Sequence, residues 1–346
     1  MERAKSLIVK LKDVANLAGV SESTASLVLN NKPGIKTSTR QKVMDAVNTL
    51  GYTPNGIAQG LATSKSKTIG LVVTDIENPF FGSLTKFIDQ SIRSYNYGLI
   101  LSVSNDQVDT ENQILEDFVR KRVEGIIIVP SFSQRHDFKA YENLEKRHIP
   151  YIFTTTYYPG YENRCVMTDL SKGSYILVKY LLDMGHRKIV FFLSSDPTVA
   201  LSSLRLQGYR KAFAEKNLTV NEDLIIPCVR PDYHSAYQSA NILLQNHKVD
   251  AIVTINDYMA LGAKRAAEEL GYKIPDDLSI AGYDDVVFAS LSEIPLTTVR
   301  QPISSIGRIT VDNLFSMIEK KQKSPEQILI EPELIVRQST APVSVA

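Results

Sequence analysis

Near its N-terminus the chain carries an apolar spacing that specifies a short helix followed by a sharp break. Val14, Leu17 and Ala18 fall at positions i, i+3 and i+4, which lie on one face of a helix. Gly19 interrupts this pattern, and Ser21 then supplies a side-chain oxygen that suits the start of a following helix. This segment therefore predicts a helix that ends in a tight turn.

A second short helix is predicted directly after that turn. Ala25, Val28 and Leu29 repeat the apolar spacing, so one stripe of the helix is expected to be buried. Its opposite face carries Glu22, Ser23, Ser26, Leu27 and Asn30. Two short helices joined by a glycine turn, with small and polar residues on the free face of the second, suit the major groove of DNA. The alternative is an ordinary helical hairpin that packs against something else.

A third helix is predicted to complete the unit. Ser38 and Gln41 have the spacing of a capping box, and Gly51 is expected to end the helix. The residues that share its apolar face are Val43, Ala46, Val47 and Leu50. Three helices within this length indicate an all-α helix-turn-helix head, expected over residues 1–54.

The charge of the chain is unevenly distributed. Residues 1–68 contain ten lysines and arginines and four acidic residues, a net charge of +6, while the whole chain carries +1, which leaves −5 for residues 69–346. Because nucleic-acid binding depends on neutralising phosphates, a basic N-terminal region fits a DNA-binding role. A solvated basic surface without a partner is the alternative reading.

Four sequence segments resemble the head of the LacI/GalR family of bacterial transcription regulators. They are residues 11–21 (LKDVANLAGVS), 23–26 (STAS), 28–30 (VLN) and 50–55 (LGYTPN). The similarity extends from about residue 11 to residue 338, which is nearly the whole chain. It implies a homodimer on a palindromic operator, since a two-fold protein axis matches two half-sites.

The resemblance implies that the second helix and a hinge after the head contact the operator. The residues carried over as DNA contacts are Ser21, Glu22, Ser23, Thr24, Ser26, Leu27, Asn30, Asn55, Ala58 and Leu61. By resemblance, the hinge becomes helical on DNA and Leu61 wedges into the minor groove. Residues 55–63 are short, and Gly56 and Gly60 each cost a helix about 1 kcal/mol, so we expect disorder without DNA. Residues 55–67 are thus expected to hold the hinge helix and the linker into the body. A flexible linker whose leucine has no role is the alternative.

One departure from the family bears on base recognition. Many members carry an arginine at the position of Leu27, where two hydrogen bonds to guanine discriminate by about 1–3 kcal/mol. Leucine can only contact a thymine methyl group, so we expect a different operator sequence. Glu22 is placed to accept from a cytosine amine or, as the interpretation we favour, to interact with the dipole at the N-terminus of its helix.

The rest of the chain alternates between apolar runs of strand length and helical stretches. The predicted strands are residues 69–73, 99–103, 125–129, 150–153, 188–193, 224–226, 251–255 and 278–281. Helices are expected between them, for example over residues 81–95 and 111–121. Continuous apolar strands separated by helices indicate parallel sheets covered on both faces. The pattern predicts an α/β body over residues 68–340, with two interleaved Rossmann-like subdomains, a central cleft and a periplasmic-binding-protein-like architecture.

Polar and aromatic side chains follow several strands, and the resemblance implies that they line an effector pocket. The positions carried over are Phe80, Phe81, Thr155, Arg205, Tyr233, Asn256 and Asp284. The phenylalanines are expected to pack on the ligand, Arg205 to bind its oxygens, and Asn256 and Asp284 to hydrogen-bond to its hydroxyl groups. This combination favours a sugar, while a purine or another small metabolite uses the same groups.

Some of these residues also fit ordinary structural roles. Phe81 has the position of the first core residue of its helix, and Asp257 that of an N-cap for a helix that starts at Met259. Asp285 is a second candidate cap. Arg205 and Asp284 are the stronger candidates for ligand contact, because charged groups facing a cleft are costly unless something satisfies them.

Catalysis finds little support in the sequence. No phosphate-binding glycine loop, nucleophile elbow or dinucleotide-binding fingerprint follows a predicted strand. The five histidines show no metal spacing, and Cys165 and Cys228 do not suggest a zinc site, so we expect neither metal nor cofactor. Two cysteines without a signal peptide predict a cytoplasmic protein, and no apolar run is long enough to cross a membrane.

The resulting interpretation is a ligand-responsive transcription regulator, a repressor of carbohydrate-utilisation genes. A periplasmic-type sugar receptor shares the two-lobed body, but it needs a secretion signal and lacks a basic head. A sugar-modifying enzyme with an added DNA-binding domain needs a catalytic base and a phosphate loop. Responses to a nucleobase or to a phosphoprotein partner also stay open, as does whether the ligand releases DNA or promotes its binding.

Overall fold

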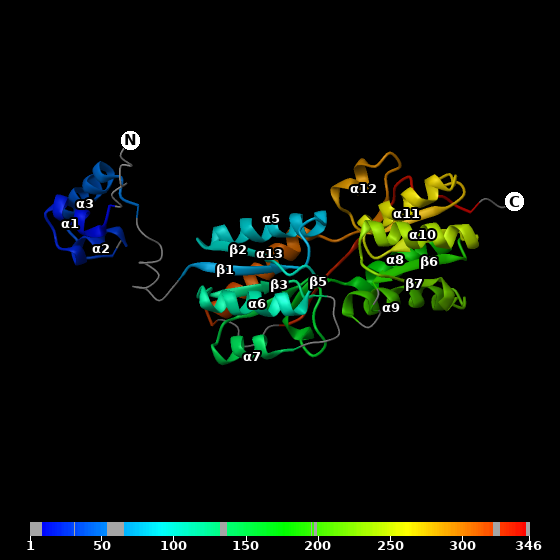
Figure 1. Cartoon of the computed structure of the whole chain (residues 1–346), viewed down its shortest axis with the longest axis horizontal. Helices are drawn as coiled ribbons and strands as arrows, with labels where there is room; N and C mark the ends of the chain where they lie inside the picture. The colour runs from blue at the N-terminus through cyan, green and yellow to red at the C-terminus, as the bar shows by residue number, and fades with distance from the viewer. Residues whose placement is uncertain are drawn as a thin grey trace, which may run out of the picture. The chain divides into compact units, whose positions relative to one another are not determined.

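The computed structural model describes residues 9–30, 32–53, 66–131, 137–194, 196, 199–320 and 326–343. Its contacts divide the chain into two compact units, Met1–Ser66 and Lys67–Ala346, which are called the head and the body below. Figure 1 shows the helices of the head and the two sheets of the body. The division falls inside the predicted linker, between Ser66 and Lys67.

The described part of the head is a unit of three helices, as the sequence predicts. They are α1 (Leu11–Ala18), α2 (Glu22–Leu29) and α3 (Thr37–Leu50). Gly19 ends α1 in the left-handed conformation with φ of 66°, and Ser21 caps α2 by accepting a hydrogen bond from the Thr24 backbone N–H. The small core of the head is formed by Val14, Ala15, Ala18, Ala25, Val28, Val43 and Ala46.

Two details of the head differ from the prediction. Leu17 does not join the buried stripe and is 53% exposed, whereas Ala15, the neighbour of Val14, is buried. The predicted capping box of Ser38 and Gln41 was also wrong, since α3 begins one residue before Ser38 and has no side-chain cap. Gln41 instead donates from Nε2 to Oδ1 of Asp45, 2.8 Å away along the same helix.

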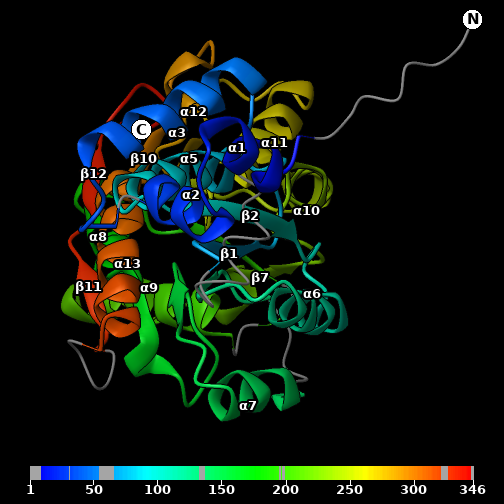
Figure 2. The ribbon, with the colours of Figure 1, turned by 90° about the vertical axis from the view of Figure 1, so that its left-hand side faces the viewer.

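The first sheet of the body has six strands in the order β11-β5-β4-β3-β1-β2. Their bounds are β1 (Thr68–Val73), β2 (Gly98–Val103), β3 (Gly125–Ile128), β4 (Tyr151–Thr154), β5 (Cys165–Thr168) and β11 (Ile328–Ile330). Helices α5 (Pro79–Ser94) and α13 (Ile303–Ile318) lie on one side of β1, and α6 (Val108–Arg120) and α7 (Lys139–Lys146) on the other (Figure 2). All pairings between these strands are parallel.

The second sheet repeats the plan with the order β12-β10-β9-β8-β6-β7. Its strands are β6 (Ile189–Ser194), β7 (Ile225–Cys228), β8 (Ala251–Thr254), β9 (Ser279–Asp284), β10 (Thr297–Arg300) and β12 (Glu333–Ile335). Helices α8 (Leu170–Asp183) and α9 (Ala200–Glu215) pack together against this sheet, as do α10 (Tyr233–Asn246) and α11 (Asp257–Glu269) (Figure 1). A short helix, α12 (Val287–Leu291), follows β9.

Burial on both faces explains why the strands read as continuous apolar runs. Along β1, Ile69 and Leu71 point into the cluster formed with α5 and α13, whereas Val72 joins the opposite cluster with Phe118 of α6. Gly70 lies under that phenylalanine, and an added Cβ would come within 2.4 Å of its ring. Both sides of each central strand are therefore packed, as parallel sheets require.

The two sheets are interleaved in sequence. The chain passes from the first sheet to the second after β5, returns after β10 into α13, and crosses again between β11 and β12. The prediction missed β5, β10, β11 and β12, each of which has only three or four residues. The predicted fold class is nonetheless confirmed by the two α/β sheets behind a helical head.

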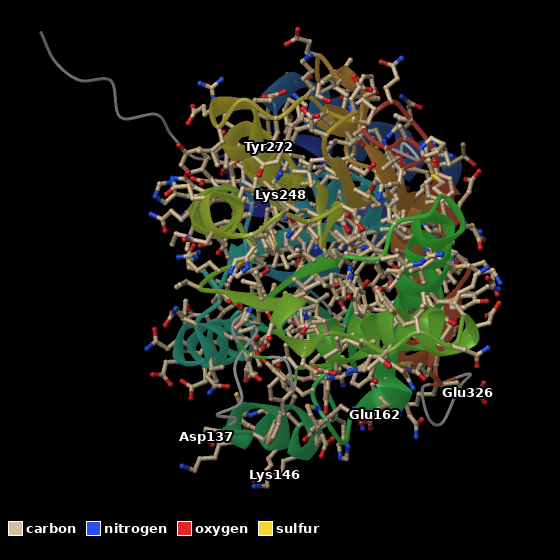
Figure 3. All side chains as sticks on the ribbon, turned by 90° about the vertical axis from the view of Figure 1, so that its right-hand side faces the viewer. Asp137, Lys146, Glu162, Lys248, Tyr272 and Glu326 are labelled. Atoms are coloured by element: carbon tan, nitrogen blue, oxygen red, sulfur yellow. The ribbon has the colours of Figure 1, made fainter. Side chains whose placement is uncertain are left out.

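Charged side chains lie on the outer surface of the body. Asp137, Lys146 and Lys248, labelled in Figure 3, are exposed at its periphery. Within the ranges that the structure describes, no set of histidine, cysteine and acidic side chains is placed to hold a metal ion. No helix among the described residues has the length and apolar character needed to cross a membrane. Cys165 and Cys228 are free and buried.

Candidate effector cleft and DNA-reading helix

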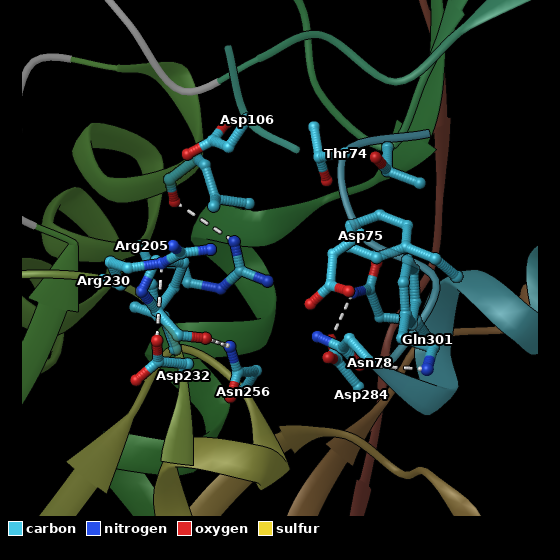
Figure 4. Close-up of a pocket in the computed structure, with 16 residues that line it drawn as sticks. Thr74, Asp75, Asn78, Asp106, Arg205, Arg230, Asp232, Asn256, Asp284 and Gln301 are labelled. Atoms are coloured by element: carbon cyan, nitrogen blue, oxygen red, sulfur yellow. Dashed lines mark hydrogen bonds and ion pairs between the residues drawn. The ribbon is translucent and has the colours of Figure 1, made fainter. Parts of the chain in front are cut away.

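A cleft that is open to solvent lies where the strand ends of the two sheets meet (Figure 4). It is lined by Thr74, Asp75, Asn78, Phe80, Phe81, Asp106, Thr155, Leu201, Arg205, Arg230, Pro231, Asp232, Ile255, Asn256, Asp284 and Gln301. Most of these residues follow the carboxyl ends of parallel strands, where open α/β sheets bind their ligands. Six of the seven predicted effector contacts are among them.

Arg205 is a buried cation in the wall of this cleft. It projects from α9, is only 2% exposed, and donates from Nη1 to the Leu201 carbonyl at 3.1 Å. Its guanidinium carbon lies 4.1 Å from the centroid of the Tyr283 ring. Its Nε has no hydrogen-bond partner among the described residues. A buried donor without an acceptor is costly, so Arg205 is poised to bind an oxygen from a ligand.

Asp284 is the acidic counterpart of Arg205 in the same cleft. It ends β9, is buried, and accepts a hydrogen bond of 2.6 Å from Nε2 of Gln301. Burial raises the pKa of Asp284 to about 7, against the smaller lowering effects of Arg205 and Gln301. Its carboxyl group therefore offers a site for ligand hydroxyl groups.

Unusual backbone conformations gather around the cleft. Positive φ angles occur at Asn105 (51°), Asp106 (59°), Thr155 (68°), Asp284 (110°) and Asp285 (56°). A β-branched residue such as Thr155 rarely adopts this conformation, and strained residues concentrate at binding sites, where surrounding structure holds them. The clustering supports a binding role for these strand ends.

Asn256 forms the helix cap that the sequence suggested for its neighbour Asp257. Asn256 is the N-cap of α11, accepting from the Met259 backbone N–H at 2.7 Å, and its Nδ2 donates to the Pro231 carbonyl. The prediction that Asp257 is the cap was wrong, because α11 begins at this residue. Asp257 is fully buried and accepts from the Val286 N–H and the Thr298 hydroxyl, and burial raises its pKa well above the usual value.

Asp285 forms ion pairs instead of a helix cap. Its two carboxylate oxygens contact Nε of Arg300 at 2.7 Å and Nη2 of Arg337 at 2.6 Å. These contacts tie the end of β9 to β10 and to the segment after β12. The neighbouring Asp284 is thereby held on the cleft side of the strand end.

Phe80 and Phe81 fit both roles considered in the sequence analysis, packing in the core and contact with a ligand. Their rings contact each other edge to face with centroids 5.3 Å apart, and both belong to the core under α5. They also line the cleft. Asn78 caps the helix by accepting from the Phe80 backbone N–H at 3.0 Å, which fixes both rings at the cleft wall.

Tyr233 is the predicted effector residue that the structure does not bring into this cleft. It begins α10, and its ring lies 6.0 Å from that of Tyr258. The loop before it lines the cleft instead, through Arg230, Pro231 and Asp232. Sequence reasoning also missed Thr74, Asp75, Asp106, Leu201, Ile255 and Gln301. Gln301 was missed because it follows the unpredicted strand β10, whereas Asp75 and Asp106 follow strands that were predicted.

In the head, α2 presents the predicted DNA-reading face. Glu22, Ser23 and Asn30 are exposed and Ser26 is half-buried, while Leu27 is 44% exposed. Two predicted contacts also have local structural partners, because Ser21 caps the helix and Asn30 donates to the Ser26 carbonyl at 2.9 Å. The hinge positions Asn55, Ala58 and Leu61 lie outside the described residues.

The head and the body both match known protein families. Residues 10–55 match the bacterial regulatory proteins of the lacI family, and residues 178–340 match the periplasmic binding protein-like domain. The HTH-type transcriptional regulator DegA of Bacillus subtilis (strain 168) is 34% identical over 332 residues, covering 96% of this chain and 98% of that protein. The chain belongs to the lacI family of bacterial regulatory proteins. The HTH-type transcriptional repressor PurR of Histophilus somni (strain 129Pt) is 33% identical over 332 residues, covering 95% and 98%.

Solved structures of the lacI family share the fold. The lac repressor dimer bound to operator and the anti-inducer ONPF has a TM-score of 0.82 and 26% identity, with 96% of this chain and 99% of that chain covered. A LacI family transcriptional regulator from Enterococcus faecium with bound ribose has a TM-score of 0.71 and 29% identity, covering 80% and 100%.

As a lacI-family member, the chain is a DNA-binding transcription regulator with an effector-binding body. The predicted resemblance is thus confirmed. These relatives are regulators and not enzymes. A periplasmic-type receptor does not account for residues 10–55, which match the DNA-binding head of the family.

Proposed function

We propose that this regulator represses carbohydrate-utilisation genes and that a sugar bound in the cleft switches its affinity for the operator. The observation that carries the proposal is the pairing of Arg205, which has an unpartnered buried donor, with the buried acceptor Asp284. A sugar hydroxyl both accepts and donates, so neighbouring hydroxyl groups satisfy both side chains at once.

The aromatic content of the cleft also favours a sugar over a nucleobase. Phe80 and Phe81 are the aromatic side chains that line it, and both rings are largely enclosed by the core. A sugar needs one apolar patch for its C–H face, whereas a planar base is commonly held between two flat surfaces. The structure of the Enterococcus faecium relative is described with bound ribose. The relationship to PurR keeps a purine as the second candidate.

On the DNA side, we propose that α2 enters the major groove with Ser21, Glu22, Ser23, Thr24, Ser26, Leu27 and Asn30 as its contact residues. The exposure of Leu27 supports this assignment, because an apolar side chain on a polar helix face suits a thymine methyl group. We further propose that Asn55, Ala58 and Leu61 contact the minor groove from the hinge.

A second copy of the chain is the partner proposed for the apolar surface of α12. In this helix Val287, Phe288 and Leu291 are 58%, 48% and 71% exposed, an unusual concentration for five residues. The related lac repressor binds its operator as a dimer. Two heads on one operator gain affinity through effective concentration, so burying α12 between copies serves DNA binding.

The proposed switch is a shift between arrangements of the two lobes. The chain joins the lobes at three crossings, and the cleft takes side chains from both, such as Asn78 from the first and Asp284 from the second. A ligand that contacts both walls stabilises one relative position of the lobes. A coupling of about 1–3 kcal/mol is enough to change operator affinity fivefold or more.

The direct test measures operator binding by fluorescence anisotropy, with DNA from the promoter region of the chain's own gene. Mono- and disaccharides are added alongside purine bases at the same concentration. The proposal expects one sugar to change operator affinity at least fivefold. A change caused by a purine and by none of the sugars would refute the sugar assignment and favour the second candidate.

A further inference from the structure

One buried glutamate contacts the strand ends of the first sheet. Glu111 belongs to the first turn of α6, its side chain is fully buried, and it pairs with no cation among the residues that the structure describes. A carboxyl group in the interior is costly unless hydrogen bonds compensate for the lost water. The hydrogen-bond partners of Glu111 therefore indicate what this side chain does.

Four donors surround the Glu111 carboxylate. Its Oε2 accepts from the Ser131 backbone N–H at 2.9 Å and from the Ser131 hydroxyl at 3.0 Å. Its Oε1 accepts from the Tyr141 hydroxyl at 2.5 Å, and the Tyr158 hydroxyl lies 2.9 Å from both oxygens. Burial raises the pKa of Glu111, and these hydrogen bonds act to lower it. Glu111 is thus the acceptor at the centre of a buried hydrogen-bond cluster.

The donors come from segments that follow different strands of the first sheet. Ser131 follows β3, Tyr158 follows the neighbouring strand β4, and Tyr141 belongs to α7. Thr155, which lines the cleft, lies on the same connection as Tyr158. Glu111 therefore joins α6 to the loops that leave two neighbouring strands.

A pair of serines extends this cluster to the ends of β1 and β2. Ser131 Oγ lies 3.2 Å from Ser104 Oγ, and Ser104 follows β2 on the other side of β1. The Ser104 backbone N–H donates to the carbonyl of Val73, the last residue of β1, at 2.9 Å. The next residue, Thr74, lines the cleft with a buried hydroxyl that has no hydrogen-bond partner among the described residues. The contacts thus run from Glu111 across the end of β1 to the cleft wall.

We propose that Glu111 is a positioning residue for effector binding, because it holds in place the strand ends that carry Thr74 and Thr155. It acts through Ser131 and Tyr158 and is not itself among the residues that line the cleft. A site whose polar groups are fixed before the ligand arrives loses less conformational freedom on binding. The inference rests on the proposed function only in taking the cleft as the effector site, and it applies to a sugar and to a purine alike.

Two substitutions of Glu111 separate hydrogen bonding from packing. Glu111→Gln keeps one carbonyl oxygen for Ser131, and its amide nitrogen can donate to the hydroxyl groups of Tyr141 and Tyr158, which also accept. Glu111→Leu fills a similar volume but offers no acceptor. If packing were the only role of this side chain, leucine would replace it as well as glutamine does.

The first measurement is amide hydrogen exchange of the full-length chain without ligand. The ratio of the exchange rates of Ser131 and Ile127 compares the end of β3 with a fully buried residue inside that strand. Glu111→Leu should raise this ratio at least about tenfold, because the Ser131 N–H loses its acceptor, and Glu111→Gln should change it less than about threefold. An unchanged ratio in Glu111→Leu would overturn the positioning role.

The second measurement is calorimetric titration with D-ribose, D-glucose, hypoxanthine and guanine as probes. For each probe that binds the parent chain, affinity should fall at least about tenfold in Glu111→Leu and less than about threefold in Glu111→Gln. Leu115→Ala is the matched control, since this fully buried residue of α6 supports stability but makes no hydrogen bond to a strand end. An equal loss of affinity in Leu115→Ala would contradict the proposal, because the cleft would then respond to any weakening of the lobe.

Ser131→Ala provides a second route to the same answer should Glu111→Leu fail to fold. It removes one hydroxyl and with it the contact to Ser104, so the exchange rate of the Ser104 amide should rise at least about threefold. No change in this rate would refute the link across β1. Operator affinity without ligand shows whether each variant is folded. The exchange rates need no ligand, so they decide the positioning role whether the effector proves to be a sugar, a purine or neither.

Discussion

The guanidinium group of Arg205 lies over the ring of Tyr283, with its carbon 4.1 Å from the ring centroid. The ring itself has little room to move, because its Oη lies so close to Gly173 of α8 that an added Cβ would approach within 2.1 Å. Packing of α8 against β9 therefore fixes the surface on which the arginine rests. The unpartnered Nε of Arg205 is held in place before any ligand arrives.

This arrangement predicts that Arg205→Met separates ligand response from stability. Burial disfavours the charged form of Arg205 and lowers its pKa, so an apolar side chain of similar length is expected to leave the free energy of unfolding unchanged or raised. Effector affinity should fall by about 1.5–3 kcal/mol, the usual contribution of hydrogen bonds to a charged group. Chemical denaturation and calorimetry measure the two quantities, and an unaltered effector affinity would place the ligand elsewhere.

A second prediction concerns pH. Burial raises the pKa of Asp284 to about 7, compared with about 3.9 in an unfolded chain, so the folded protein holds this proton more tightly. The carboxyl group then makes its largest contribution to stability at low pH, and this contribution is lost as pH rises from about 4 to about 7. Asp284→Asn should remove a pH dependence of up to about 4 kcal/mol over this range.

The measurement for Asp284 is urea-induced unfolding of the parent chain and the variant between pH 4.5 and 8. Asp257 also has a raised pKa, but it is present in both proteins, so most of its effect cancels in the difference. Two stability curves that run parallel across this range would show that Asp284 titrates normally in the folded chain.

Base recognition provides a third prediction. Leu27→Arg places a guanidinium group on the exposed face of α2, and we expect a shift in preference toward guanine at one position of each half-site. The expected discrimination is about 1–3 kcal/mol, measured by anisotropy on operators that differ at single base pairs. Met44→Arg on α3 is the control, since it adds the same charge at a side chain that is 40% exposed. A uniform gain in affinity for all operators, seen in both variants, would indicate a purely electrostatic effect.

The fourth prediction tests the α12 surface. Leu291→Asp introduces a charge where a partner copy is expected to bury an apolar side chain that is 71% exposed in the single chain. The variant should be monomeric at concentrations where the parent chain is dimeric, and its operator affinity should fall at least about a hundredfold through lost avidity. Analytical ultracentrifugation gives the oligomeric state. Ile242→Asp, at a residue of α10 that is 68% exposed, is the control and should stay dimeric.

Two glycine substitutions should have opposite effects on stability. At Gly208 an added Cβ would come within 2.0 Å of the Ser171 carbonyl oxygen, so Gly208→Ala is expected to separate α8 and α9 and to cost at least about 1–3 kcal/mol. At Gly82 in α5 nothing lies within 4 Å, so Gly82→Ala should stabilise the chain by about 0.4–1 kcal/mol. Thermal unfolding of both variants checks the prediction, and equal shifts would contradict this account of the helix contact.

Local patterns in the sequence were enough to predict the helices of the head and the turn between the first two. The spacing of Val14, Ala18, Ala25 and Val28 predicts two short helices, and Gly19 predicts the turn between them. These features depend on residues a few positions apart. The predicted cap at Ser38 failed for the same reason, because a capping spacing can occur by chance inside a helix that begins earlier.

The cleft was only partly predictable. Arg205, Asn256 and Asp284 were identified through the family resemblance, and they line the cleft as expected. Asp75 and Asp106 also follow predicted strands, but nothing local marks them as facing a shared cavity. Gln301 follows β10, a strand of four residues with no clear flanking signals.

By itself the sequence determined the three helices of the head and the two series of strands and helices of the body. It also determined that the N-terminal region is basic and the rest of the chain acidic. Each follows from short-range periodicity or composition, which a chain carries before it folds. Only the tertiary structure decided how the two sheets interleave, and that arrangement places Asp106 from one lobe and Asp232 from the other in a single cleft. The reason is that a binding site depends on which strand ends become neighbours, and this is fixed by packing between segments far apart in the chain.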